Sequence, residues 1–257
     1  MKRLFLSLSA ACVLLNATPA LAFMNEVALL KEELQAYQSN SAHAADFSDI
    51  VERLSNEENG FNDVHESDWF SAAVMALKHW GILGGKKNVN GEPTGEFDPE
   101  GDVTFGAALK ISFKAAQKDL TTCEGGSVDS HSHWASVYLV CAKDMHFRIL
   151  EARKAPNLDN TVTRAQVLAI IHDAFGEKVT YRSAPFKDTV KHPYEADIAL
   201  AYEQGVVTGD KVAPGKKHQF RPNALLSRAE LAIILFNELN VRAKEELQAK
   251  AGKDGSS

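Results

Sequence analysis

The chain has 257 residues, of which 45% are hydrophobic and 24% are charged, and its formal net charge is −6. This length allows one or two domains, and the hydrophobic fraction is ordinary for a protein with a packed core. An acidic chain without a basic stripe argues against nucleic acid as a partner, because binding to nucleic acid depends on neutralising phosphates.

The first 22 residues have the pattern of a secretory signal peptide. Lys2 and Arg3 precede an apolar run over 4–15, and Ala20-Leu21-Ala22 forms a small-residue cleavage site. The alternative is an N-terminal membrane anchor, but the run is shorter than the ~20 residues that a spanning helix needs. No later stretch is long and apolar enough to span a membrane. We therefore expect export to the cell surface, the cell wall or a periplasm.

Residues 23–60 are expected to form an N-terminal helix and a linker. Apolar side chains recur at helical spacing, at Val27, Leu30, Leu34 and Tyr37. Such a helix either packs on the rest of the chain or pairs with another copy, so self-association stays open.

Three later segments share one order of motifs, and we divide the chain at 61–120, 121–179 and 180–240. Each segment has an acidic turn, an aromatic-led apolar helix, a loop and a second apolar helix that starts at a hydroxyl residue. Trp69, Trp134 and Tyr194 lead the first helices, and Thr104, Thr163 and Ser227 precede the second ones. Internal repetition of this kind predicts three copies of one structural unit around a shared centre.

Local signals make these segments helical. Thr163 with Gln166, and Ser227 with Glu230, have the spacing of a capping box, in which hydroxyl and carboxamide or carboxylate satisfy first-turn amides. Few stretches alternate as strands do, so we expect an all-α fold. The tail, 241–257, is polar and charged and is expected to fray.

Two cysteines, Cys123 and Cys141, follow the predicted signal peptide. An even pair in an exported chain suits a disulfide, but pairing needs Cα atoms within about 7 Å. A bridge and two separate thiols both remain open at this point.

The ordered set of motifs resembles S-layer homology (SLH) repeats. The residues that carry the resemblance are Phe61-x-Asp63-Val64, Trp69, Gly81-Ile82, Phe97-x-Pro99 and the boxes Thr163-Arg164-Ala165-Gln166 and Ser227-Arg228-Ala229-Glu230. The resemblance covers about 61–239. It implies three helical-hairpin repeats in a pseudo-threefold, three-pronged spindle with a central helical bundle. It also implies attachment to a cell-wall polysaccharide or peptidoglycan-linked polymer, often pyruvylated, in grooves between the prongs.

Carried over to this chain, the resemblance assigns Arg164 and Arg228 to ligand contact. A guanidinium matches a carboxylate in two hydrogen bonds, and a pyruvyl ketal offers such a carboxylate. Trp69 and Trp134 are candidates for apolar contact with sugar rings. Loop glycines permit close approach of a ligand to the backbone, and the candidates are Gly81, Gly84, Gly205 and Gly209.

The chain departs from the family pattern at three places. The first box reads Thr104-Phe105-Gly106-Ala107 and lacks the arginine, His146 stands where the first segment has Gly81, and Tyr194 replaces the tryptophan. We therefore expect at most two competent grooves. Asp63, Asp129 and Asp188 are expected to tie down turns.

Enzymatic and metal-dependent functions find no support in the motifs. The chain has no G-x-S-x-G elbow, no Walker loop and no H-E-x-x-H. His131 and His133 lie two residues apart without the tighter ligand sets of zinc sites. The sequence thus predicts a non-catalytic anchoring module without a cofactor; the alternative is an envelope protein–protein scaffold that has lost glycan binding.

Overall fold

The computed structural model describes residues 60–123, 133–151, 157–210 and 218–254, together with Phe23, Met24, Val27 and Leu29. Over these residues it is helical and has isolated β-bridges but no strand, which confirms the all-α prediction. The predicted signal peptide, the linker over 39–45, Asp129 and His131 lie outside the described residues.

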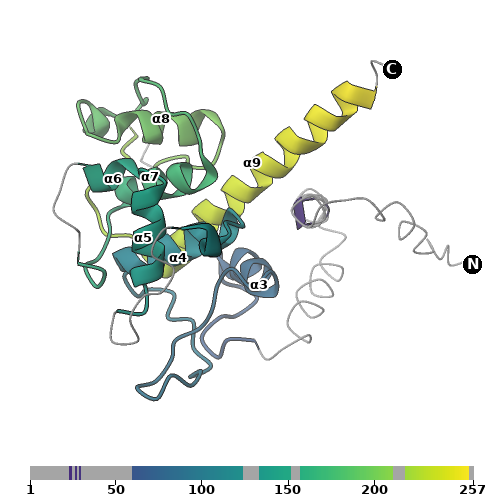
Figure 1. Ribbon diagram of the computed structural model, residues 1–257, viewed down its shortest axis with the longest axis vertical. Helices are drawn as coiled ribbons and strands as arrows, with labels where there is room; N and C mark the ends of the chain where they lie inside the picture. The colour runs from purple at the N-terminus through teal and green to yellow at the C-terminus, as the bar shows by residue number, and fades with distance from the viewer. Residues whose placement is uncertain are drawn as a thin grey trace, which may run out of the picture.

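Each of the three segments contributes a first and a second helix (Figure 1). The first helices are α3 (Ser71–His79), α5 (Ser136–Asp144) and α8 (Glu195–Glu203); the second helices are α4 (Phe105–Ala115), α7 (Arg164–Phe175) and α9 (Arg228–Asp254). The remaining elements are the short helix α6 (Arg148–Glu151) and two 3-10 turns, η4 (Leu120–Thr122) and η5 (Lys187–Thr189).

A closed ring of backbone hydrogen bonds joins the three segments just before their second helices. The amide of Val103 donates to Leu226, that of Leu226 to Val162 and that of Val162 back to Val103, at 3.0, 3.3 and 2.9 Å. Because every backbone donor in the ring finds its acceptor in a different segment, no segment can complete this arrangement alone. The ring fixes the starting points of α4, α7 and α9 next to one another.

The first helices do not pack mainly on the second helices of their own segments. Instead α3 packs on α9, α5 on α4 and α8 on α7, and α4 also contacts α7 and α9. In Figure 1, α8 lies beside α7, and α5 beside α4. The structure therefore differs from the expected helical hairpins, because each first helix packs against the second helix of another segment.

The helix ends follow the local signals in the sequence. The capping box of Thr163 and Gln166 is complete, and Ser227 and Glu230 exchange the same two hydrogen bonds at 3.1 and 3.2 Å. Past the first helices, Gly81, His146 and Gly205 all adopt positive φ, at 68°, 56° and 77°. His146 therefore takes the left-handed conformation that glycine adopts in the other two segments.

Helix α9 continues through Asp254, well beyond the third segment (Figure 1). This corrects the expectation of a frayed tail from 241. The added turns are rich in alanine, lysine and glutamate, which favour helix, and Arg242 donates to Glu238 one turn earlier at 2.8 Å.

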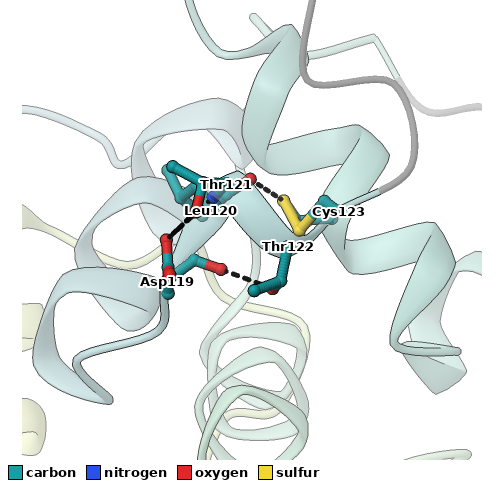
Figure 2. Close-up of a disulfide and its surroundings, with 6 residues drawn as sticks. Asp119, Leu120, Thr121, Thr122 and Cys123 are labelled. Carbon is teal, nitrogen blue, oxygen red and sulfur yellow. Dashed lines mark hydrogen bonds between the residues drawn. A yellow bond between two sulfur atoms is a disulfide. The ribbon is translucent and has the colours of Figure 1, made fainter.

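Cys123 and Cys141 are joined by a disulfide, with their Cα atoms 5.1 Å apart. The bond ties the η4 turn, which follows α4, to helix α5 (Figure 2). A loop of this size contributes about 3 kcal/mol to stability by restricting the unfolded chain.

Within the described part of the chain, none of the helices offers a run of apolar residues sufficient to cross a membrane.

Candidate functional site

A pocket of about 600 Å³ lies where the three segments meet. Its floor and walls come from the loop after α3, from one face of α4, from Trp134 ahead of α5 and from Arg228 at the start of α9. The lining therefore depends on the packing of all three segments.

Arg228 is fixed at the base of this pocket by backbone carbonyls. Its Nε donates to the carbonyl of Phe97 at 2.7 Å and its Nη2 to that of Gly84 at 2.9 Å, and the guanidinium lies 4.6 Å from the centroid of the Phe97 ring. Both acceptors are neutral carbonyls, and the carboxylates of Asp98 and Asp63, which act electrostatically on Arg228, are not among the described lining residues. A guanidinium held in this way can donate two parallel hydrogen bonds to a carboxylate.

Four lysines line the same pocket, and no carboxylate is found among its described lining residues. Lys86 and Lys87 come from the loop, and Lys110 and Lys114 stand one turn apart on α4. Burial, with the positive charges of Lys114 and Lys87, lowers the pKa of Lys110. The concentration of positive charge makes the pocket suited to an acidic ligand even though the whole chain is acidic.

The loop that carries two of these lysines is held by an aspartate. Asp63 accepts the amides of Phe97 and Asp98 at 2.7 and 2.6 Å, and Asp188 accepts those of Phe220 and Arg221 in the third segment at 3.0 and 2.7 Å. This confirms the prediction that Asp63 and Asp188 tie down turns. The pocket wall is thus preorganised before any ligand arrives.

Trp134 is 55% exposed although it lines the pocket. Lys110 Nζ lies 5.4 Å from the ring centroid, and His133 beside it contacts Asp159 at 3.0 Å. An exposed indole next to a cation combines a flat apolar face with positive charge, a combination suited to an acidic sugar.

Arg164 has the same position in the second segment but different surroundings. Its Nε donates to the carbonyl of Phe220 at 3.1 Å, as Arg228 does to Phe97, yet its Nη1 pairs with Glu230 at 2.7 Å. Arg164 is only 8% exposed and does not line the described pocket. The structure therefore separates the two arginines that the sequence treats alike.

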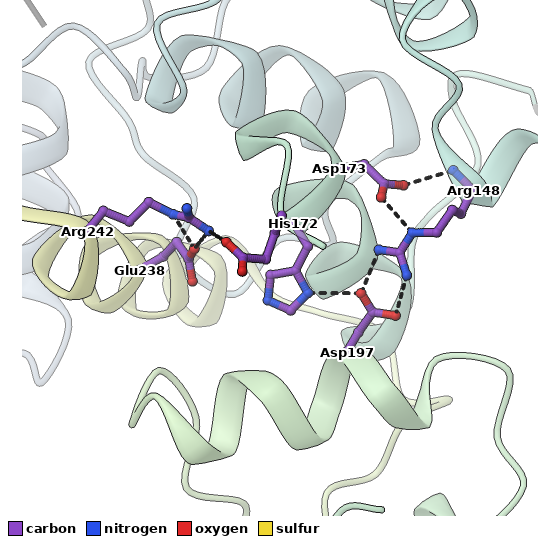
Figure 3. Close-up of polar contacts among 7 residues, drawn as sticks. Arg148, His172, Asp173, Asp197, Glu238 and Arg242 are labelled. Carbon is purple, nitrogen blue, oxygen red and sulfur yellow. Dashed lines mark hydrogen bonds and ion pairs between the residues drawn. The ribbon is translucent and has the colours of Figure 1, made fainter. Parts of the chain in front are cut away.

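At the start of α4, Phe105 stands at the position of the arginine. A network of charged groups joins α6, α7 and α8 (Figure 3). Arg148 donates to Asp173 at 2.7 Å and to Asp197 at 2.8 Å, and Asp197 also contacts His172 at 2.9 Å. Although burial opposes it, hydrogen bonds from His172 and Arg148 lower the pKa of Asp197. The guanidinium of Arg148 and the two carboxylates pair with one another, while Nε2 of His172 is buried without a hydrogen-bond partner among the described residues.

Some of the site residues predicted from the sequence line the pocket, and others lie elsewhere. The described pocket brings together Gly84, Trp134 and Arg228, while Gly81 contributes the carbonyl that accepts Lys114 Nζ at 2.7 Å. Arg164, Trp69, Gly205 and Gly209 lie outside this lining. Gly205 ends α8 at positive φ, and at Gly209 an added Cβ would lie 2.4 Å from the ring of Phe186, so both serve the turn.

The missing arginine of the first box does not leave the loop of the first segment without an arginine contact. Because α9 begins beside the first segment, Arg228 serves the loop of that segment, and Arg164 reaches the loop of the third. Beside the second segment the equivalent position is taken by Phe105, whose amide donates to the carbonyl of Asn160 at 2.8 Å. Sequence reasoning missed the lysines as well; the spacing of Lys110 and Lys114 on one face of an amphipathic helix was the available signal.

Over the described residues, no group of three or more His, Cys, Asp or Glu side chains is arranged to hold a metal ion.

Comparison with known protein families gives a match in the third segment. The family model described as the S-layer homology domain matches residues 185–232, from η5 through α8 to the first turn of α9. No curated protein matches the chain. S-layer homology domains are non-enzymatic modules that anchor proteins at the cell wall, so residues 185–232 are similar to a cell-surface anchoring domain.

Proposed function

We propose that this protein is a non-catalytic anchor that binds an anionic cell-wall polysaccharide in the pocket around Arg228. The observation that carries the proposal is the composition of that pocket: one arginine, four lysines and an exposed tryptophan, with no carboxylate among the described lining residues. A soluble acidic protein gains nothing from concentrating cations in this way unless the pocket meets an anion.

The chemistry of the pocket favours a sugar that carries a carboxylate. Arg228 can bind two carboxylate oxygens at once, Lys87 and Lys110 add charge at the rim, and Trp134 provides a face for a pyranose ring. A pyruvylated secondary polymer combines these features in one residue. A polyanion without rings, such as polyphosphate, lacks the apolar face that Trp134 would contact.

Export supports the same proposal. The chain begins with the pattern of a signal peptide, and the Cys123–Cys141 disulfide suits an oxidising compartment outside the cytoplasm. The three-pronged arrangement implied by the SLH resemblance is also part of the proposal; the ring through Val103, Val162 and Leu226 supports it.

The test is co-sedimentation of the mature protein with protein-free cell-wall sacculi from its own source. We expect binding to intact sacculi and loss of binding after chemical removal of the secondary polymer. Absence of binding to intact sacculi would refute the anchoring function and favour a protein–protein scaffold in the envelope.

A pair of variants locates the site. Lys87→Ala with Lys110→Ala removes two rim charges that hold no backbone carbonyl, and we expect affinity to fall about tenfold or more from loss of two charge-assisted contacts. The matched control is Lys118→Ala with Lys143→Ala, two exposed lysines outside the described lining. Equal affinity of both double variants would place binding elsewhere.

A further inference from the structure

We propose that Glu230 is an internal substitute for the ligand anion at Arg164, and that Ala107 at the matching position leaves Arg228 open. This inference rests on the proposed function. The residue at this position of a second helix then determines whether the neighbouring arginine can bind a ligand. With Arg164 closed and Arg228 open, the protein binds one anionic ligand.

The two arginines are otherwise held alike. Each donates its Nε to a phenylalanine carbonyl, and each guanidinium lies over the ring of that same phenylalanine, at 4.6 Å for Arg228 over Phe97 and 5.0 Å for Arg164 over Phe220. The difference lies in the remaining nitrogens. For Arg228 the third contact is the neutral carbonyl of Gly84, whereas for Arg164 it is the carboxylate of Glu230.

Glu230 and Ala107 have equivalent places in their helices. Each is the third residue after the cap, which is Ser227 for α9 and Thr104 for α4. Ala107 lines the pocket next to Arg228, so a carboxylate at 107 would enter the pocket as Glu230 enters the space beside Arg164. The methyl group of Ala107 instead leaves that space for an external anion.

Glu230 is held at both of its oxygens. Oε2 accepts the amide of Ser227 at 3.1 Å, while Oε1 accepts Arg164 Nη1 at 2.7 Å. Because the capping box already fixes this side chain, the ion pair forms with little further loss of rotamer freedom. An external carboxylate would have to displace an anion that the fold itself keeps in place.

The surrounding charges reinforce the contrast. Beside Arg164, Arg221 pairs with Asp210 at 2.5 Å and lies 3.9 Å from Glu230, so two cations face two carboxylates. Beside Arg228, Lys86 and Asp98 form the corresponding ion pair at 2.6 Å. Here the first residue of the pair in the chain is the cation, whereas in the pair of Asp210 and Arg221 the first residue is the carboxylate. The pocket lysines on α4 then leave an excess of positive charge there, whereas among the described residues the charges around Arg164 are balanced.

At the remaining segment boundary, the arginine that the structure describes is already paired. Arg148 and its two aspartates are mutually paired and mostly buried, with side-chain exposures of 35%, 9% and 2% for Arg148, Asp173 and Asp197. One open arginine, one closed arginine and one self-paired network account for the three boundaries.

The first experiment closes the open pocket. Ala107→Glu places a carboxylate beside Arg228 and also completes a capping box with Thr104, so the helix should not lose stability. We expect at least a tenfold loss of sacculus binding, measured by co-sedimentation, with unchanged circular dichroism and thermal midpoint. Ala107→Gln is the matched control, because it fills the same space and has the same capping capacity without charge; it should lose clearly less binding than Ala107→Glu, and an equal loss in both variants would overturn the role of charge at position 107.

The second experiment opens the closed site. Glu230→Gln keeps the capping geometry that Gln166 already provides in α7 and frees the Arg164 guanidinium. Titration with soluble polymer fragments released from the sacculi should show one site in the natural protein and two in this variant. A stoichiometry that stays at one in the folded variant would overturn the role of Glu230.

The outcomes separate this inference from the proposed function. If the natural protein fails to bind sacculi, the anchoring function itself is wrong. If the natural protein binds and Ala107→Glu binds equally well, anchoring stands and the inference about position 107 is overturned.

Discussion

The pocket around Arg228 and the network around Arg148 occupy equivalent boundaries of one scaffold, yet they treat charge in opposite ways. Lys114 and Asp173 stand at the same turn of α4 and α7, and in the loops Leu83 corresponds to Arg148. In the first region the cations lie at an open pocket with no carboxylate among the described lining residues, whereas in the second each charge meets its partner inside the protein.

The difference teaches that the backbone of this fold does not decide which boundary binds a ligand. The same ring of hydrogen bonds and the same positive-φ turn after the first helix appear on both sides. A few side chains decide whether the space between helices stays open or is closed by an internal ion pair. The closed boundary contributes structure, and the open one is free to contribute recognition.

The largest effect expected from this comparison is the loss of Asp197. Asp197→Ala leaves the fully buried His172 without its carboxylate partner and takes one of two aspartates from Arg148, so we expect a loss of about 3–5 kcal/mol in the free energy of unfolding. Urea denaturation measures it. Lys110→Ala, on the open side, is the comparison and should change stability by less than about 0.5 kcal/mol.

A loss below about 1 kcal/mol for Asp197→Ala would show that water or rearrangement relieves the buried charges. The two boundaries would then not differ in the way that their contacts indicate.

The disulfide is expected to have the next largest effect. Because the bond between Cys123 and Cys141 ties the chain after α4 to α5, which follows Trp134, its loss loosens the open side of the molecule. Cys123→Ser with Cys141→Ser should lower the free energy of unfolding by about 3 kcal/mol. A reducing agent should destabilise the natural protein by the same amount and leave the double variant unchanged; equal stability with and without reductant would contradict this.

The smallest expected effect is a loss of stability at acidic pH. Hydrogen bonds from His172 and Arg148 lower the pKa of Asp197 below its ordinary value, so its contribution is complete above about pH 4 and is lost as the pH falls through the lowered value. Asp173 opposes this, because burial raises its pKa. We expect the free energy of unfolding to decline below about pH 4.

Asp197→Asn should flatten that decline relative to the natural protein, and Asp144→Asn, at an exposed position of α5, should leave it unchanged. Urea denaturation across the acidic range provides the measurement. An equally steep decline in Asp197→Asn would assign the acid response to other carboxylates.

The sequence alone determined the features that depend on near neighbours in the chain. Capping at Thr163 and Ser227, the left-handed turn at Gly81 and Gly205 and the all-α class all follow from residues within a few positions or from one repeated pattern. These interactions are local, so their partners can be read from spacing.

Only the tertiary structure decided which segment each arginine serves. The ring of backbone hydrogen bonds places the start of α9 beside the first loop, and nothing in the spacing of Arg228 indicates the carbonyls of Phe97 and Gly84 as its acceptors. The four lysines converge for the same reason, because α4 and the loop after α3 meet only in the folded protein.

Arg164 shows most clearly that packing between segments determines which arginine is available. Its motif predicts ligand contact as firmly as that of Arg228, yet Glu230, sixty-six positions away, neutralises it. Electrostatic pairing depends on distance in space and on burial, which a repeated motif does not encode. The sequence determined the helices and their caps, and packing between segments determined which charge remains available to a ligand.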